Sequence, residues 1–106
     1  MKKQNDSMRF HSLKEINRQL KVHKPRLQSR FKVREIGVFG SYVRNQQRKR
    51  SDVDILIDFE ESPDFLTFLE LELYLEHILK VKVDMVRKAA LRPQLRDRIL
   101  REVVYV

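Results

Sequence analysis

The feature that most limits the folds open to this chain is a nearly continuous apolar run at residues 53–59, VDILIDF. Five of its seven residues are apolar, and most of these are β-branched or aromatic, which favours a strand over a helix. A strand with one solvent-exposed face alternates apolar and polar residues, whereas a strand covered on both faces does not. The run therefore predicts a strand covered by protein on both sides, within an α/β domain.

The residues before this run predict two helices and a further strand. Ser12 is a suitable N-cap, with Glu15 three residues later and apolar residues following at helical spacing. Pro25 interrupts that spacing, and we expect it to open a second short helix. The expected elements are thus a helix from Ser12, a helix at 25–31, a strand at 33–39, a short helix at 41–45 and a charged loop at 46–50.

The residues after the run predict two more helices and a third strand. Pro63 is expected to open a helix whose broad buried face consists of Phe65, Phe68, Leu69, Leu73, Leu75 and Leu79. Residues 81–86 read as a strand, and residues 91–103 as an amphipathic helix with Leu95, Ile99 and Val103 on one stripe. The expected fold class is α/β (α+β), a small mixed sheet of about three strands packed with helices.

Length and composition restrict the chain further. Its 106 residues fit one domain, which we expect at residues 12–106 after a flexible leader at 1–11. The absence of cysteine excludes a disulfide scaffold, a thiolate zinc site and a cysteine nucleophile. No apolar run approaches the ~20 residues of a membrane span, and no signal-peptide core follows the polar start. We therefore expect a cytoplasmic protein.

Charge is unevenly distributed along the chain. The net charge is +8, but residues 1–50 carry a balance of +12 and residues 51–106 a balance of −4. A basic half beside a carboxylate-bearing half suits nucleic-acid binding. It suits equally well a small polyanion, such as a nucleotide, held against a metal site, and the charge alone does not choose between them.

Both glycines of the chain lie near the end of the predicted strand at 33–39. Glycine is used where a side chain would obstruct the backbone or where φ must be positive. At the start of a short helix, the backbone N–H groups of Gly40-Ser41 and the Ser41 hydroxyl can point at an anion. Taken alone, the pair is more typical of an ordinary strand-to-helix turn than of an anion site.

Three aspartates stand at strand positions where aspartate is unfavourable. Asp52 and Asp54 are two residues apart, so their side chains share one face and repel each other unless a cation such as Mg²⁺ lies between them. Asp84 joins them if the strand at 81–86 pairs with the run at 53–59, and three carboxylates can hold two Mg²⁺ ions ~4 Å apart. The alternatives are a solvated strand edge or helix-style capping by one aspartate for the first two, and an ion pair with Lys82 or Arg87 for Asp84.

Together these residues resemble a known family, the minimal nucleotidyltransferase domain of the polymerase-β-like superfamily. The resemblance rests on Gly40-Ser41-x-x-Arg44, on Ser51-Asp52-x-Asp54 before the apolar strand, and on Asp84 in a later strand, and it extends over about residues 12–103. It implies that Gly40 and Ser41 hold the β- and γ-phosphates of a nucleoside triphosphate, with Arg44 nearby. It also implies that Asp52 and Asp54 ligate Mg²⁺, and that Asp84 completes the metal site and helps to activate the attacking hydroxyl. Many members have Ala and Gly where this chain has Val43 and Asn45.

The resemblance also implies an activity and a partner. The expected activity is Mg²⁺-dependent transfer of a nucleoside monophosphate, AMP from ATP, to an acceptor hydroxyl. Standalone domains of this kind resemble the antitoxin half of toxin–antitoxin pairs, in which the partner is a HEPN-type ribonuclease toxin and the acceptor is a tyrosine of that partner. Two alternatives stay open: a non-catalytic antitoxin that acts by contact alone, and a basic nucleic-acid-binding module.

Overall fold

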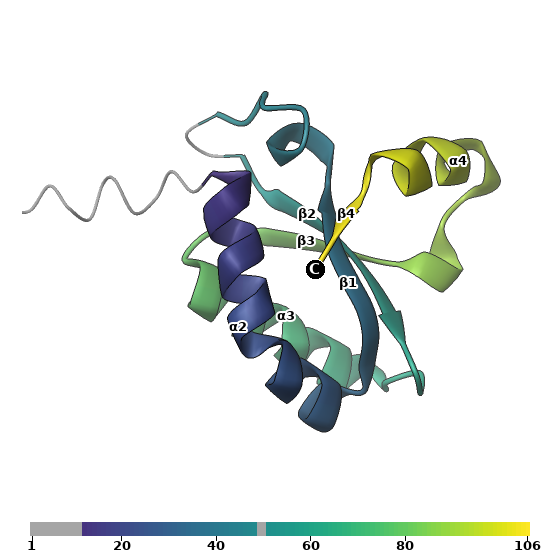
Figure 1. Cartoon of the computed structure of the whole chain (residues 1–106). Helices are drawn as coiled ribbons and strands as arrows, with labels where there is room; N and C mark the ends of the chain where they lie inside the picture. The colour runs from purple at the N-terminus through teal and green to yellow at the C-terminus, as the bar shows by residue number, and fades with distance from the viewer. Residues whose placement is uncertain (1–11, 49–50) are drawn as a thin grey trace, which may run out of the picture.

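The computed structural model describes residues 12–48 and 51–106, so the expected leader and two residues of the charged loop lie outside the described part. Figure 1 shows helices and strands arranged around one small sheet. In chain order the elements are α2 (Leu13–Phe31), β1 (Val33–Phe39), the 3₁₀ turn η1 (Gly40–Tyr42), β2 (Val53–Phe59), α3 (Phe65–Leu79), β3 (Val83–Arg87), the 3₁₀ turn η2 (Lys88–Ala90), α4 (Pro93–Glu102) and β4 (Val104–Tyr105). None of the described helices is both long and apolar enough to cross a membrane.

The sheet is mixed and has four strands in the order β3-β2-β1-β4. β1 runs antiparallel to both β2 and β4, whereas β2 and β3 are parallel. The prediction of an α/β fold with a small mixed sheet is confirmed, but β4 was not foreseen. That strand is only two residues long, too short to leave a periodic signal in the sequence.

The apolar run forms β2, and both of its faces are buried as predicted. Ile55 and Ile57 belong to the main core, which α2 and α3 cover. Leu56 points the other way, into a smaller core with Phe39 and Ile99 of α4. The sheet therefore lies between α2 and α3 on one side and α4 on the other (Figure 1).

The expectation of a helix break at Pro25 was wrong. The helix begins as predicted, with the Ser12 hydroxyl accepting a hydrogen bond from the Glu15 amide at 3.2 Å, and it continues through Pro25 to Phe31. A proline inside a helix costs ~3 kcal/mol because a backbone hydrogen bond is lost. Leu20, Leu27 and Phe31 extend one buried stripe across the proline, and their burial outweighs that cost.

The predicted buried face of α3 was partly wrong. The helix begins after Pro63, where the Asp64 carboxylate accepts a hydrogen bond from the Thr67 amide at 2.8 Å. Its fully buried residues are Leu71, Leu75 and Leu79, while Phe65, Leu69 and Leu73 are exposed. Apolar residues occur on more than one side of this helix, so their spacing did not indicate which side is buried.

Three smaller boundaries also differ from expectation. β3 begins at Val83 and ends at Arg87, rather than spanning residues 81–86. The segment after β1 forms a single 3₁₀ turn, and α4 is shorter than the expected range 91–103. Of the apolar stripe expected on α4, Ile99 is buried, the side chain of Leu95 is exposed and Val103 is half-buried.

Candidate active site

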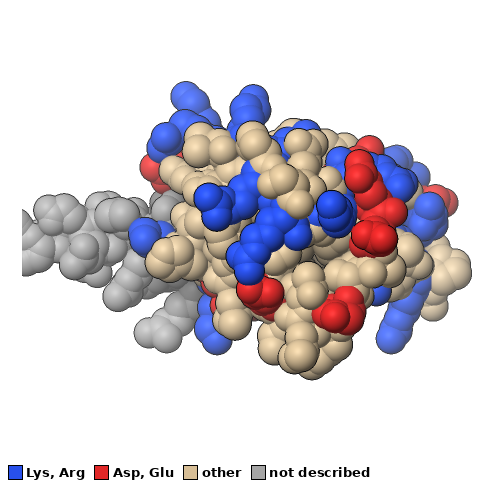
Figure 2. Space-filling model, turned by 90° about the horizontal axis from the view of Figure 1, so that it is seen from below, with Lys and Arg blue, Asp and Glu red and all other residues tan. Residues whose placement is uncertain are grey.

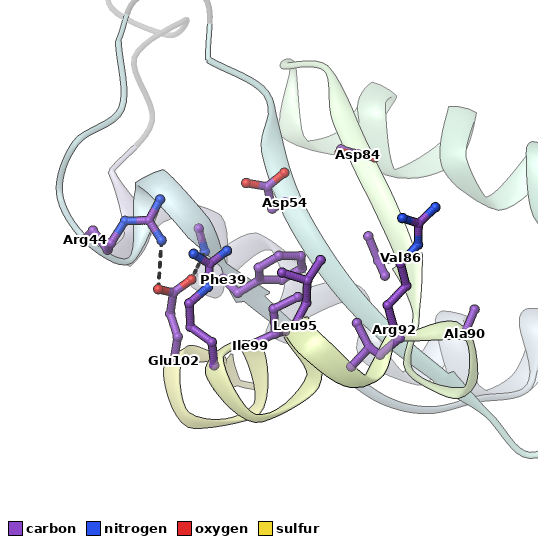
Figure 3. Close-up of a pocket in the computed structure, with 13 residues that line it drawn as sticks. Phe39, Arg44, Asp54, Asp84, Val86, Ala90, Arg92, Leu95, Ile99 and Glu102 are labelled. Carbon is purple, nitrogen blue, oxygen red and sulfur yellow. Dashed lines mark hydrogen bonds and ion pairs between the residues drawn. The ribbon is translucent and has the colours of Figure 1, made fainter.

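A cavity of about 350 Å³ opens between the sheet and α4. Gly40, Arg44, Asp54 and Asp84 line one side of it, and η2 and α4 form the other side (Figure 3). That second side combines apolar residues with Arg92 and Arg98, so the cavity brings together arginines, carboxylates and an apolar floor. Such a lining suits a ligand that has both a polyanionic and an apolar part.

The pairing of two parallel strands brings Asp54 and Asp84 together. They are direct partners in the β2–β3 register, and neighbouring strands lie ~4.8 Å apart. Asp54 is half-buried, whereas Asp52 and Asp84 are exposed. The expectation that the third strand would pair beside the apolar run is therefore met, although the pairing assigns no role to either carboxylate.

The carboxylates disfavour one another's ionised forms. Burial, followed by the neighbouring charges of Asp84 and Asp52, raises the pKa of Asp54 from 3.8 to about 6, although Arg44 opposes this shift. A carboxyl group in such surroundings favours binding either a proton or a cation. Hard carboxylate oxygens that repel each other are a suitable donor set for a divalent cation such as Mg²⁺.

This shift predicts a pH-dependent stability. Because Asp54 binds its proton more tightly in the folded chain, folding is favoured at low pH, and this advantage is lost as the pH rises from 3.8 through about 6. The full linkage is ~3 kcal/mol, which solvent screening of a half-exposed group reduces to about 1 kcal/mol. In metal-free buffer we expect Asp54→Asn to raise the free energy of unfolding at pH 7.5 by that amount, but to change it little at pH 4.

Urea denaturation at the two pH values measures this effect. Asp58→Asn is a matched control, because Asp58 lies on the same strand but pairs with Arg34 at 3.5 Å outside the cavity. It should give no gain in stability at pH 7.5. An Asp54→Asn variant destabilised equally at both pH values would contradict the proposed repulsion.

Gly40 begins the turn that follows β1, and the structure explains why no side chain is tolerated there. Its φ is +80°, and a Cβ atom would lie 2.1 Å from Oδ2 of Asp54. The close contact is therefore with a carboxylate of the cavity. A side chain is excluded at Gly37 for a different reason: a Cβ atom there would lie 2.7 Å from the Val104 carbonyl oxygen of β4.

Glu102, at the end of α4, is the site residue that sequence reasoning missed. Its Oε2 accepts a hydrogen bond from the Gly40 amide at 2.6 Å, and its Oε1 accepts one from Arg44 at 2.8 Å (Figure 3). Burial alone would raise the pKa of Glu102, but the hydrogen bonds from Gly40 and Arg44 lower it overall. The turn after β1 thus already holds an anionic group. The sequence gives no signal for this contact, because a glutamate near the end of an amphipathic helix is typical of a solvated surface.

The remaining predicted site residues lie around the cavity rather than on its wall. Ser41 and Asp52 are not among the lining residues, although Asp52 is close enough for its charge to raise the pKa of Asp54. Within residues 12–48 and 51–106, no three His, Cys, Asp or Glu side chains converge closely enough to hold a metal ion by themselves. A divalent cation here would need further ligands, and Mg²⁺ commonly takes these from substrate phosphates and water.

Comparison with known proteins places this arrangement in a family. The nucleotidyltransferase domain family matches residues 20–106. The protein adenylyltransferase MntA of Thermococcus cleftensis is 56% identical over 95 residues, which span 90% of this chain and 96% of the relative. A solved structure described as a candidate minimal nucleotidyltransferase superposes with a TM-score of 0.75 at 35% identity, covering 89% of this chain and 95% of that one.

A toxin–antitoxin structure with bound AMP-PNP is also similar. Its TM-score is 0.67 at 25% identity, over 82% of this chain and 70% of that one. The match to the family and the high identity to MntA each extend over most of the sequence. This chain therefore belongs to the nucleotidyltransferase domain family, among the minimal nucleotidyltransferases that resemble the protein adenylyltransferase MntA.

Proposed function

We propose that this chain transfers AMP from Mg²⁺-ATP to a tyrosine hydroxyl of a HEPN-type toxin, and so acts as a cytoplasmic antitoxin. The observation that carries the proposal is the pair Asp54 and Asp84 on neighbouring strands, beside Gly40 and Arg44, which both donate hydrogen bonds to the Glu102 carboxylate. The name of the Thermococcus relative supports a protein acceptor. The toxin–antitoxin complex with AMP-PNP supports an adenine nucleotide and a toxin partner.

In this proposal the triphosphate takes the place of the Glu102 carboxylate. The Gly40 amide and the Arg44 guanidinium then donate to phosphate oxygens, and the Ser41 hydroxyl adds a further donor at the same turn. Arg92 and Arg98, on the opposite wall, balance the remaining negative charge. The nucleoside would occupy the part of the cavity between these two walls, against the apolar residues of α4.

The three aspartates would bind the metal, and Asp84 would also accept the proton of the attacking hydroxyl. Asp52, Asp54 and Asp84 would share the ligation of one or two Mg²⁺ ions, with phosphate oxygens and water as the further ligands. Bound Mg²⁺ would neutralise phosphate charge and acidify the attacking hydroxyl. Asp84 is exposed, so it can accept a hydrogen bond from an acceptor hydroxyl that arrives from outside. The tyrosine oxygen forms a bond to the α-phosphorus, the bond to the β-phosphate oxygen breaks, pyrophosphate leaves, and the hydroxyl proton passes to Asp84 or to solvent.

Transfer of α-³²P from ATP tests this function. Purified toxin and the antitoxin should yield a labelled toxin band only when Mg²⁺ is present, and a Tyr→Phe toxin variant should stay unlabelled. Label from γ-³²P-ATP should not appear, because the β- and γ-phosphates leave. Failure to label the toxin although the two proteins bind tightly would instead support a contact-only antitoxin.

A nucleic-acid-binding function is the second candidate, and one surface favours it. Arg26, Arg30, Lys32 and Arg34, at the end of α2 and the start of β1, are all exposed. Figure 2 shows Lys and Arg side chains gathered in the middle of the face seen from below. A steep fall of RNA affinity with salt would support this function. Two of these arginines already pair with acids, Arg30 with Glu70 and Arg34 with Asp58, which weakens the case.

Glu102 gives a prediction about nucleotide affinity. If its carboxylate occupies the phosphate position, a neutral amide should compete less well, since hydrogen bonds to charged groups are stronger by ~1 kcal/mol. We expect Glu102→Gln to bind Mg²⁺-ATP roughly fivefold more tightly in calorimetry. Asp97→Asn, an exposed acid of the same helix that does not line the cavity, is the matched control and should leave the affinity unchanged. Weaker ATP binding by Glu102→Gln would mean that Glu102 positions Arg44 for the nucleotide instead.

A further inference from the structure

Helix α3 carries an exposed apolar stripe that the described part of the chain does not cover. Its members are Phe65, Leu66, Leu69 and Leu73, which are 75%, 73%, 39% and 59% exposed. Residues 65, 69 and 73 are four apart, so they form one row along the helix, and Leu66 lies beside it. Burial of apolar side chains of this size against a partner is favourable. These four residues, the α3 stripe, therefore form an exposed apolar surface whose burial would favour binding of a partner.

Acidic residues border the α3 stripe. Residues 60–79 contain six Asp or Glu and no Lys or Arg, although the chain as a whole has a net charge of +8. Glu72 and Glu76 follow Leu69 and Leu73 by three positions, so each acid adjoins a leucine on the helix surface. Glu70 lies on the other border and is paired with Arg30 of α2.

The acidic border of α3 faces the strand that carries Asp84. Glu76 Oε2 accepts a hydrogen bond from the Val83 amide of β3 at 3.0 Å. Burial, followed by the charges of Glu76 and Asp84, raises the pKa of Glu72. α3 and the cavity lie on opposite faces of the sheet, and β3 is an edge strand, so the two faces meet around β3 with no further strand beyond it. A protein that docks on the α3 stripe and extends around this edge would approach Asp84.

We propose that the α3 stripe is the docking surface for the acceptor protein, and that it binds an amphipathic helix with apolar residues flanked by Lys or Arg. This inference rests on the proposed function, because it supplies the acceptor for that same site. Apolar residues of the incoming helix would cover Leu69 and Leu73, and its basic residues would pair with Glu72 and Glu76. Docking there would bring an acceptor hydroxyl to the open side of Asp84.

Other occupants fit less well. A second copy of this chain has a basic helix, α2, but the apolar side of that helix is buried in its own core. Two copies meeting through α3 would oppose acidic borders of the same sign. An anionic membrane surface would be repelled by the same acids. A basic amphipathic helix satisfies both the apolar row and the charges around it.

The double variant Leu69→Ser/Leu73→Ser tests the proposal in the full-length protein, with purified HEPN-type toxin as the probe. We expect the toxin affinity to fall at least tenfold, while Mg²⁺-ATP affinity and the thermal midpoint stay near those of the wild type. Val22→Ser is the matched control, because Val22 is an exposed apolar residue of α2 outside both the stripe and the cavity. It should bind toxin normally.

Charge and assembly provide two further readouts. Toxin binding by the wild type should weaken with added salt, and Glu72→Gln should reduce that salt dependence. Unchanged toxin affinity in the double variant would overturn the proposal, as would a wild-type homodimer that the double variant abolishes. If the double variant loses toxin binding but the wild type never labels the toxin, the docking surface stands and adenylyl transfer fails.

Discussion

Asp84→Asn is expected to lower AMP transfer to the toxin by at least about 100-fold while leaving most of the nucleotide affinity in place. The substitution removes the exposed carboxylate that we propose accepts the proton of the incoming hydroxyl, but Gly40, Arg44 and Asp54 still line the cavity. Asparagine has nearly the same shape, so the β2–β3 pairing should persist. Single-turnover labelling with α-³²P-ATP, alongside calorimetry with Mg²⁺-ATP, separates the two effects.

A toxin pull-down completes that experiment. Asp84→Asn should bind the toxin as the wild type does, because Asn removes charge without changing the surface of α3. Asp97→Asn, on α4 outside the cavity, is again the matched control and should transfer AMP normally. Transfer at nearly the wild-type rate by Asp84→Asn would mean that Asp84 has only a structural role in β3.

The double variant Asp52→Asn/Asp54→Asn should have the second large effect, the loss of Mg²⁺-dependent ATP binding. Two of the three carboxylates proposed to hold the ion are removed, so the phosphates lose the cation that links them to the sheet. We expect ATP affinity measured with Mg²⁺ to fall at least tenfold, to about the value that the wild type shows in EDTA. Calorimetry with and without Mg²⁺ on both proteins measures this difference.

The fold itself should survive the double substitution. Relief of the repulsion that raises the pKa of Asp54 should leave the variant at least as stable as the wild type in metal-free buffer at neutral pH. A thermal melt therefore serves as the control for folding. Equal Mg²⁺-ATP affinity in the variant and the wild type would show that the metal site lies elsewhere.

The sequence predicted the parts of the fold that depend on local patterns. The apolar run at 53–59 indicated a strand buried on both faces because its composition leaves few alternatives. Ser12 indicated the start of α2 because an N-cap is also a local sequence pattern. Pro25 misled because the packing that offsets its cost comes from Leu27 and Phe31 contacting the rest of the core, which no local pattern reveals. The buried side of α3 was likewise decided by tertiary packing.

The candidate site divides in a similar way. Gly40, Asp54 and Asp84 were identifiable because their residue types are unusual or unfavourable at these positions and invite a chemical explanation. Arg44 was expected only from the family resemblance, and all four residues line the cavity. Glu102 was not identifiable, since its partners Gly40 and Arg44 are about sixty residues away in the chain and only the packing of α4 brings them together. The docking surface proposed on α3 could not be predicted from the sequence either. Its exposed leucines have the helical spacing that is typical of core residues.

Intact-mass spectrometry of the toxin, purified after co-expression with this protein, tests the central claim most directly. We expect the toxin to gain the mass of one or more AMP groups when co-expressed with the wild type and to keep its unmodified mass with Asp84→Asn. Peptide mapping should then place each added group on a tyrosine. An unmodified toxin that is nonetheless inactive and tightly bound to the wild type would contradict adenylyl transfer and leave inhibition by contact as the function.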